Sequence, residues 1–198
     1  NPYTKFQMTD ILTYSNTDNL RKFLDSYQYL EIDPYLPSNY PPKRLRAYSK
    51  YNVYIKGNHY YIKYNSETAF KQSVDDSRKE MRIFQPIKTK YIYCNFMLEI
   101  LQNMITLVHH YNPCVEKLTI HMHQVRNITY PNDISTNSPE GIHRDGADYI
   151  VSALVLNRHN IKHGTSIIMD RNKKELLSVI LNTNEGIFQE DRELYHTV

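Results

Sequence analysis

Hydrophobic residues recur at helical spacing in two stretches of the first half of the chain. Residues 17–30 begin with an N-cap candidate, Thr17 or Asp18, and then place four hydrophobic side chains on one helical face. Residues 91–111 predict a longer helix with a single hydrophobic stripe. That stripe consists of Tyr93, Met97, Ile100, Leu101, Met104, Ile105 and Val108. We expect the longer helix to pack on a sheet.

The segments between these helices have other patterns. Residues 33–51 contain four prolines, which interrupt regular structure. Residues 44–64 are rich in Tyr, Val and Ile and contain a turn signal at Gly57-Asn58, which predicts a β-hairpin. Residues 66–82 are polar, and we expect them to be part helix and part loop.

From residue 116 onward, hydrophobic and polar residues alternate with the period of a strand. The pattern predicts one long strand over 117–130. Shorter strands are predicted over 146–157, 165–170, 174–181, 185–189 and 193–198. Helices followed by closely spaced antiparallel strands predict an α+β fold whose strand half forms a barrel or sandwich.

Composition narrows the class of protein. A chain of 198 residues fits a single domain. A net charge of +3 is too small to indicate nucleic-acid binding by itself. Cys94 and Cys114 have no C-x-x-C spacing, and neither a membrane span nor a signal peptide is visible, so we expect an intracellular, cytoplasmic protein. The chain begins at Asn1 and stops at Val198 within a predicted strand, so both ends are expected to be incomplete.

The segment GIHRDGAD, residues 141–148, carries candidate metal chemistry. On a strand, His143 and Asp145 would point to the same face and Arg144 to the other. An imidazole and a carboxylate suit Fe(II), and one more imidazole would complete a face of two histidines and one carboxylate. By itself the H-x-D match is weak, because chance gives roughly half a match in a chain of this composition.

The last predicted strand, ELYHTV, offers the second imidazole at His196. His196 shares a face with Leu194 and Val198, so a core histidine is the plain alternative. However, four strand-sized segments separate it from His143 and Asp145. That length of chain is enough to go round a small barrel and return beside the first two ligands, which favours the metal-site interpretation.

Several ordered segments resemble a known family. HQVRN, PEGIHRDGADYIVSALVLNRHNI, TSIIMD and EDRELYH resemble the small Fe(II)/2-oxoglutarate dioxygenases that include bacterial free L-isoleucine hydroxylases. The resemblance covers residues 115–198 well and the first half of the chain loosely. It implies a double-stranded β-helix (jelly-roll, cupin-like) core with flanking N-terminal helices. It also implies His143, Asp145 and His196 as the iron ligands.

The same resemblance implies an activity. An enzyme of this family would consume 2-oxoglutarate and O2, release succinate and CO2, and hydroxylate an unactivated C–H of a small substrate, here a free L-amino acid by analogy. We therefore expect one dioxygenase domain over 1–198, with a helical and hairpin part over 1–114 and a β-barrel core over 115–198. Two alternatives remain open: the same chemistry on a protein or nucleic acid, or a non-catalytic β-barrel binding protein.

The chain departs from the family pattern at two places. The segment KHGTS has His163 where the family has the first of two glycines, so a different turn is expected there. The basic residue that usually anchors the far carboxylate of 2-oxoglutarate follows the distal histidine. We expect that anchor beyond Val198.

Other polar residues have weaker functional interpretations. Gln124 and Arg126 share a face of the 117–130 strand and would contact 2-oxoglutarate or substrate if that face is inward. The alternative is an outward, solvated Arg126. Asp148 is a candidate to orient the ligand turn, or a plain turn residue.

The remaining histidines and basic residues are expected to serve structure. His121 and His123 form an H-x-H pair on the opposite face from Gln124, with no third ligand nearby in the sequence. Surface roles are favoured for Arg144 and for four other histidines, which are His109, His110, His159 and His163. The basic and aromatic segment PPKRLRAYSKY is read as a solvated strand edge rather than a nucleic-acid surface.

Overall fold

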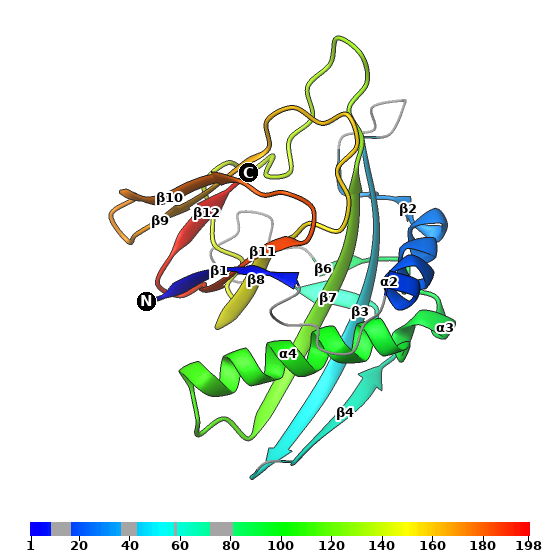
Figure 1. Cartoon of the computed structure of the whole chain (residues 1–198), viewed down its shortest axis with the longest axis vertical. Coiled ribbons are helices and arrows are strands. Elements are labelled where there is room, and N and C mark those ends of the chain that lie inside the picture. The colour runs from blue at the N-terminus through cyan, green and yellow to red at the C-terminus, as the bar shows by residue number, and fades with distance from the viewer. Residues whose placement is uncertain (9–16, 37–42, 58, 72–80) are drawn as a thin grey trace. The chain divides into compact units, whose positions relative to one another are not determined.

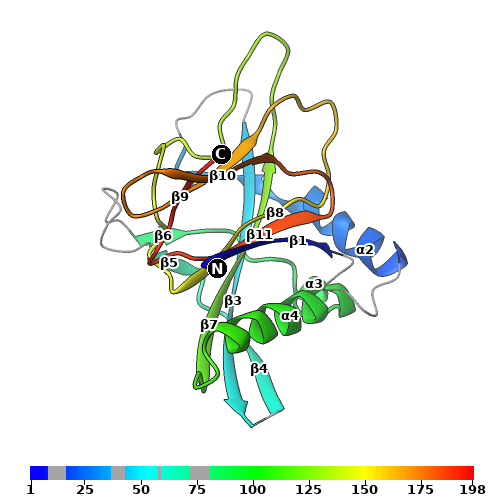
Figure 2. The same ribbon diagram turned by 60° about the vertical axis from the view of Figure 1, so that its left-hand side comes forward.

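The computed structural model describes residues 1–8, 17–36, 43–57, 59–71 and 81–198 (Figures 1 and 2). The helices are α2 Thr17–Leu24, the 3-10 helix η1 Asp25–Tyr29, α3 Thr89–Ile92 and α4 Asn95–Tyr111. The strands are β1 Tyr3–Gln7, β2 Glu31–Ile32, β3 Arg44–Lys56, β4 His59–Asn65, β5 Ala69–Lys71, β6 Met81–Ile83, β7 Lys117–Asn127, β8 Tyr149–Leu154, β9 Thr165–Met169, β10 Glu175–Ile180, β11 Glu185–Glu190 and β12 Tyr195–Thr197. This mixture of antiparallel sheets and a few helices confirms the α+β prediction.

The chain forms two compact units. Unit 1 comprises residues 1–11, 71–81 and 129–198, and unit 2 comprises residues 12–70 and 82–128. The strands β5 and β6 pair with each other where the chain passes between the units. The sequence placed a helical and hairpin part over 1–114 and the barrel core over 115–198. Strand β7, which falls within the expected core, pairs with β3 of unit 2 along its whole length. A single domain over 1–198 stays a prediction.

Unit 2 is organised around the long strand β3. The predicted hairpin is confirmed: β3 pairs antiparallel with β4 from Lys50↔Asn65 to Lys56↔His59. On its other edge β3 pairs with β7. Helix α4 lies along this sheet in both ribbon views, as expected from its hydrophobic stripe (Figures 1 and 2). The ring of Phe96 on α4 lies 4.7 Å from that of Phe23 on α2 and joins the two helices.

The predicted helix over 91–111 is interrupted. Tyr93 and Cys94 leave the helical conformation, and Tyr93, predicted as part of the buried stripe, is 49% exposed. The Tyr51 hydroxyl donates to the Ile92 carbonyl (3.0 Å), and the Tyr93 hydroxyl accepts from the Tyr64 amide (2.7 Å). These contacts satisfy backbone groups that a helix end or an edge strand leaves without partners, so the break costs little.

Two further expectations need correction in unit 2. The prediction over 17–30 is one helix, whereas the structure has α2 followed by the separate 3-10 helix η1. Both Thr17 and Asp18, the cap candidates, are already helical. The polar stretch 66–82 has short strands, β5 and β6, in its described parts, whereas residues 72–80, Asn58 and three of the four prolines lie outside the described residues.

Unit 1 consists of two three-stranded antiparallel sheets, in the orders β1-β11-β8 and β10-β9-β12. All the short strands predicted after residue 146 are confirmed, with slightly different ends. Strand β1 was not predicted. Ile168 of β9 and Ile187 of β11 belong to one buried cluster with Leu181 and Leu194, so the two sheets share a hydrophobic core. Removal of these apolar side chains from water is the main force that holds the sheets together.

Strand β11 runs through the centre of its sheet and is buried along almost its whole length. Gly186 on β11 is opposite Phe6 of β1 in the register, and the Phe6 ring packs directly on the glycine. A Cβ atom built at Gly186 would lie 2.4 Å from Cζ of Phe6 and 3.0 Å from the Ala153 carbonyl oxygen. The close approach of three strands therefore requires glycine at this position.

The KHGTS turn is built on a strained residue. His163 adopts a left-handed conformation with φ 63°, and Gly164 follows with φ 77°. The Arg158 guanidinium donates to the carbonyls of His163 (2.6 Å) and Leu181 (3.0 Å), which holds the turn in place. The histidine thus takes over the left-handed conformation that glycine adopts without cost.

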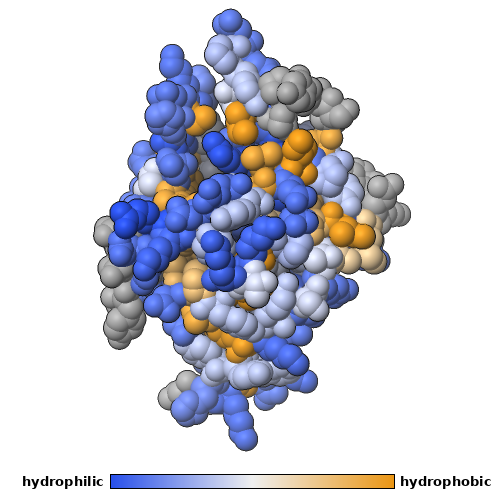
Figure 3. All heavy atoms as spheres, turned by 90° about the vertical axis from the view of Figure 1, so that its right-hand side faces the viewer, coloured by the Kyte–Doolittle hydropathy of each residue, from blue (hydrophilic) through white to orange (hydrophobic). Residues whose placement is uncertain are grey.

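On the face shown in Figure 3, hydrophobic residues form several groups among hydrophilic ones. Among the described residues, no helix is both long enough and apolar enough to cross a bilayer. Cys94 and Cys114 are free thiols.

Candidate metal centre

His143 and His196 are joined by their backbones. The His143 amide donates to the His196 carbonyl (3.1 Å), and the His196 amide donates to the His143 carbonyl (2.9 Å). His143 was expected on a regular strand. Instead it makes an isolated antiparallel bridge with β12, and Asp145 follows in the loop that leads to β8. A pair that exchanges both hydrogen bonds fixes the two residues directly opposite each other, and the ring centroids lie 4.4 Å apart.

The three side chains predicted as metal ligands converge. His143, Asp145 and His196 each offer one ligand atom, and these atoms lie within 4.8 Å of one another. Nε2 of His143 is 3.6 Å from Oδ1 of Asp145, and Nε2 of His196 is 3.8 Å from Oδ2. A point equidistant from the three atoms therefore lies within about 3 Å of each, so small side-chain shifts would reach metal–ligand bond lengths of about 2.1 Å. Two imidazoles and one carboxylate are a donor set suited to Fe(II).

The two imidazoles have opposite electrostatic environments. Burial alone would lower the pKa of His143, but the nearby Asp145 carboxylate, the contact of Nδ1 with the Gly141 carbonyl and the nearby Glu140 raise it to about 9. Nδ1 of His143 lies 2.8 Å from the Gly141 carbonyl and donates its proton to it. The other ring nitrogen, Nε2, therefore faces Asp145. Burial lowers the pKa of His196 to about 4, against the opposing effect of Asp145, so this ring is neutral at pH 7.

The loop that carries Asp145 is held by a buried carboxylate. Asp191 accepts three backbone hydrogen bonds, from the amides of Asp145 (3.2 Å), Gly146 (2.5 Å) and Ala147 (3.1 Å). Gly146 has φ 79°, which lets successive amides point at one anion. Burial and the nearby Asp145 charge raise the pKa of Asp191 to about 6, although the three amides favour its charged form. Asp191 therefore ties the Asp145 loop to the segment just before His196.

From the sequence, Asp148 was the candidate to orient this loop, with a plain turn residue as the alternative, whereas the structure gives the contacts with the loop amides to Asp191. The Asp148 side chain is exposed and pairs with Arg192, while its backbone carbonyl accepts the Asp191 amide (3.1 Å). Arg144 donates to the Arg192 carbonyl (3.2 Å) and stacks on the Tyr195 ring, as expected for a residue that points away from the ligands. The only signal for Asp191 in the sequence is its place in EDRELYH, shortly before His196.

The other predicted binding residues lie in unit 2. Gln124 is buried, and its amide donates to the Ser26 hydroxyl (2.7 Å), whereas Arg126 is exposed. A role of this pair in binding 2-oxoglutarate or substrate stays a prediction. The His121 and His123 rings are engaged separately, His121 with the Tyr48 hydroxyl (2.7 Å) and His123 with the Arg46 guanidinium (3.0 Å).

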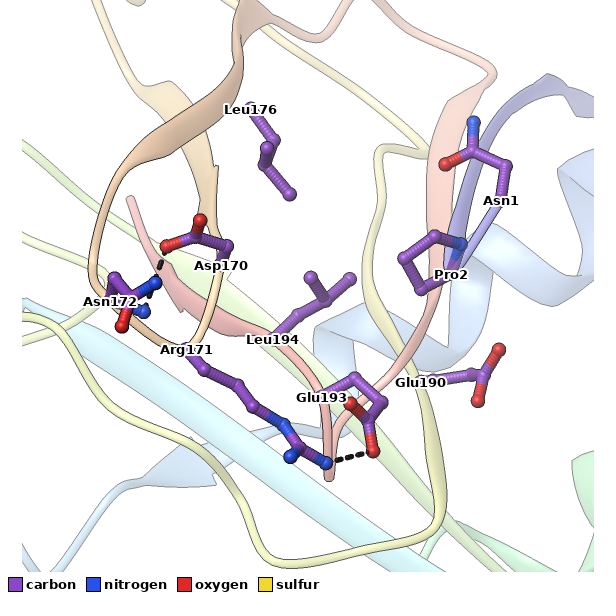
Figure 4. A pocket seen from close by; sticks show the side chains of 9 residues that line it. All are labelled: Asn1, Pro2, Asp170, Arg171, Asn172, Leu176, Glu190, Glu193 and Leu194. Atoms are coloured by element: carbon purple, nitrogen blue, oxygen red, sulfur yellow. Dashed lines mark hydrogen bonds and ion pairs between the residues drawn. The ribbon is translucent and has the colours of Figure 1, made fainter.

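A separate surface hollow occurs in unit 1, with a volume of about 450 Å³ (Figure 4). It is lined by Asn1, Pro2, Asp170, Arg171, Asn172, Leu176, Glu190, Glu193 and Leu194. Arg171 and Glu193 form an ion pair across its lower side, and Asp170 accepts from the Asn172 amide (2.8 Å). The hollow contains none of the three converging ligands.

Solved structures of other proteins resemble this chain in fold. The chain resembles the crystal structure of a bsmA homologue from Methylobium petroleophilum PM1, with a TM-score of 0.85 and 17% identity over 99% of this chain and 79% of that one. It also resembles the crystal structure of IDO from Bacillus thuringiensis, with a TM-score of 0.77 and 20% identity over 100% of this chain and 84% of that one. At these identities the two likenesses establish a shared fold.

Sequence comparison establishes the family. No curated protein matches the chain significantly. The family model for 2OG-Fe dioxygenases, however, matches residues 24–198, which include all three converging side chains. The chain therefore belongs to the 2OG-Fe dioxygenase family, whose enzymes use Fe(II) and 2-oxoglutarate.

Proposed function

We propose that His143, Asp145 and His196 bind the Fe(II) of this dioxygenase, and that the enzyme hydroxylates an unactivated C–H of a free L-amino acid. The observation that carries the proposal is the convergence of these three side chains within 4.8 Å. Two imidazoles and one carboxylate would leave coordination positions open for 2-oxoglutarate and dioxygen. The amino-acid substrate is supported by the ordered motifs that resemble free L-isoleucine hydroxylases. We further propose that the two sheets of unit 1 belong to a double-stranded β-helix core.

The chain's own residues prepare the site for the metal. Bound iron with 2-oxoglutarate would supply the oxidising power for C–H hydroxylation. The reciprocal backbone hydrogen bonds between His143 and His196 set the spacing of the two imidazoles. Gly141 accepts the Nδ1 proton of His143, so the free lone pair is on Nε2. Asp191 holds the backbone of Asp145 and so positions its carboxylate. Dioxygen is the oxidant and 2-oxoglutarate supplies two of the electrons that reduce it. No general base is required, because the hydrogen of an unactivated C–H is not removed as a proton.

Two alternatives were left open by the sequence. A non-catalytic binding protein requires His196 to lie far from the H-x-D segment, but the structure brings them together and the family is enzymatic. The same chemistry on a protein or nucleic acid differs from our proposal only in the substrate. A turnover assay separates these cases.

The assay measures succinate release with Fe(II), 2-oxoglutarate and each of the common L-amino acids, with mass spectrometry to detect an added oxygen. We expect amino-acid-dependent succinate and a hydroxylated product. Replacement of His143, Asp145 or His196 by alanine should abolish both, and His159→Ala, in an exposed loop, should not. Succinate without any hydroxylated amino acid would contradict the substrate class. Absence of all turnover in the natural full-length protein would contradict the assignment of the site.

A further inference from the structure

Gln189 is a fully buried amide beside the distal histidine. It lies on β11, is 0% exposed, and its Oε1 has no hydrogen-bond partner among the residues that the structure describes. Its Nε2 lies 3.5 Å from Nδ1 of His196, which is 5% exposed. A buried acceptor without a donor costs about 1–3 kcal/mol, so a buried amide in this position requires a physical reason.

The orientation of this amide is coupled to the proton of His196. In the orientation found, Nε2 of Gln189 donates to Nδ1 of His196 only when the neutral imidazole carries its proton on its own Nε2. Nε2 of His196 is the atom that faces Asp145, at 3.8 Å, and the atom whose lone pair a metal needs. When Nε2 of His196 binds a metal, the proton of the ring must be on Nδ1. Nδ1 is then a donor that faces a second donor, Nε2 of Gln189.

Rotation of the amide by a half-turn removes the conflict. It brings Oε1 of Gln189 to the place of its Nε2, where Oε1 accepts the Nδ1 proton of His196. The buried Oε1 then has a hydrogen-bond donor. The other acceptor near Nδ1 is Oδ1 of Asp191, at 3.9 Å, which is beyond hydrogen-bond distance and already accepts the Asp145 amide.

We propose that Gln189 is a positioning residue, which accepts the Nδ1 proton of His196 and so holds this ring with Nε2 toward the metal. The inference rests on the proposed function, because it takes His196 as a ligand. Outer hydrogen bonds of this kind change metal affinity by about 10–100-fold in other proteins. Gln189 touches no reacting atom, and its effect passes entirely through the His196 ring.

Metal affinity tests the proposal without turnover. Co(II) is titrated into the metal-free protein and its Kd measured by calorimetry and by the visible spectrum. We expect Gln189→Leu to raise the Kd by about 10–100-fold, and Gln189→Glu, which keeps an acceptor, to stay near wild type. Gln7→Leu on the neighbouring strand β1 is the matched control and should leave the Kd unchanged. A Gln189→Leu Kd within twofold of wild type would overturn the inference.

A second measurement reads the proton itself. In Zn(II)-loaded protein, proton–nitrogen NMR detects the Nδ1 proton of His196. In wild type we expect it downfield and protected from exchange, and in Gln189→Leu shifted upfield with faster exchange. An identical Nδ1 signal in both proteins would contradict the inference, and urea unfolding of the metal-free variants shows whether each is folded. If wild type binds Co(II) no better than His196→Ala, the proposed function fails rather than this inference.

Discussion

At the scale of single residues, the carboxylate of Asp191 is expected to matter more than its distance from the reaction suggests. Asp191→Asn keeps the size of the side chain but turns one acceptor into a donor that faces backbone amides. At least one of the three amides then loses its partner, which costs about 1–3 kcal/mol for a buried group. We expect the free energy of unfolding to fall by at least about 2 kcal/mol, measured by urea titration, and hydrogen exchange to quicken at residues 145–147.

Asp148→Asn is the matched control for this change. The Asp148 carboxylate is exposed and pairs with an exposed arginine, Arg192, and such pairs contribute about 0–1 kcal/mol. Equal losses of stability in the two variants would show that the three backbone hydrogen bonds to the Asp191 carboxylate contribute little to stability.

His123, in unit 2, is expected to make the free energy of unfolding depend on pH. Burial, with Arg46, His121, Arg82 and Arg44 nearby, holds the pKa of His123 well below its usual value near 6.5. The folded state therefore keeps the ring neutral, whereas the unfolded chain takes up a proton below pH 6.5. The stability that the neutral His123 ring contributes is complete above pH 6.5. It is lost as the pH falls toward the lower pKa that His123 has in the folded protein.

His123→Asn keeps an acceptor for Arg46 but does not titrate. We expect the difference in unfolding free energy between wild type and this variant to shrink as the pH falls from 7 to 5, measured by urea unfolding at each pH. His110→Asn, on the exposed end of α4, is the control. A difference that stays constant with pH would contradict the assigned pKa shift.

The residues of the site could be predicted only in part. The convergence of His143, Asp145 and His196 could be predicted because their types and spacing match a ligand set, and the structure brings the three side chains together. Asp191 was missed, since it lies in a turn over 190–193 that folds back on residues 144–148. Gln189 was missed as well, since it approaches His196 from the buried strand β11. No periodicity marks such a contact. Asp148 was chosen because it is near in sequence, although its side chain points to solvent.

At the scale of elements, periodicity was a good guide wherever one face is buried. The hairpin β3–β4, helix α4 and strands β7 to β12 follow it closely. It failed at Tyr93, where the hydrophobic stripe continues but the helix breaks. The Tyr51 hydroxyl donates to the Ile92 carbonyl and the Tyr64 amide donates to the Tyr93 hydroxyl, and these hydrogen bonds compensate the break. It also failed for β5 and β6, whose three residues are too few to show alternation.

The three-strand contact at Gly186 gives a prediction for the sheet β1-β11-β8. Gly186→Ala forces a methyl group against Phe6 and the Ala153 carbonyl, and overpacking of this kind costs about 1–3 kcal/mol. Phe6→Leu removes the ring atoms that the methyl group would meet. We therefore expect the double variant to lose less stability in urea than the sum of the two single variants. Strict additivity would mean that Phe6 does not limit the space at Gly186.

At the scale of the whole molecule, the division into units could not be predicted from the order of elements. The sequence placed the strand over 117–130 with the later strands, because both alternate with the same period. In the structure β7 instead completes the sheet of β3, and unit 1 draws β1 from the beginning of the chain. Both pairings join segments far apart in sequence, and local pattern carries no information about such partners.

The location of the candidate metal site within unit 1 predicts where metal stabilises the protein. A ligand that binds only the folded state adds RT ln(1 + [L]/Kd), about 2.7 kcal/mol at one hundred times Kd. The candidate ligand side chains lie on β12 and in the loop before β8, so opening of β12, or of β9 that pairs with it, must release the metal. Hydrogen exchange with and without Co(II) should show the added protection at these strands, and none in His196→Ala. Protection that the alanine variant retains would place the bound metal elsewhere.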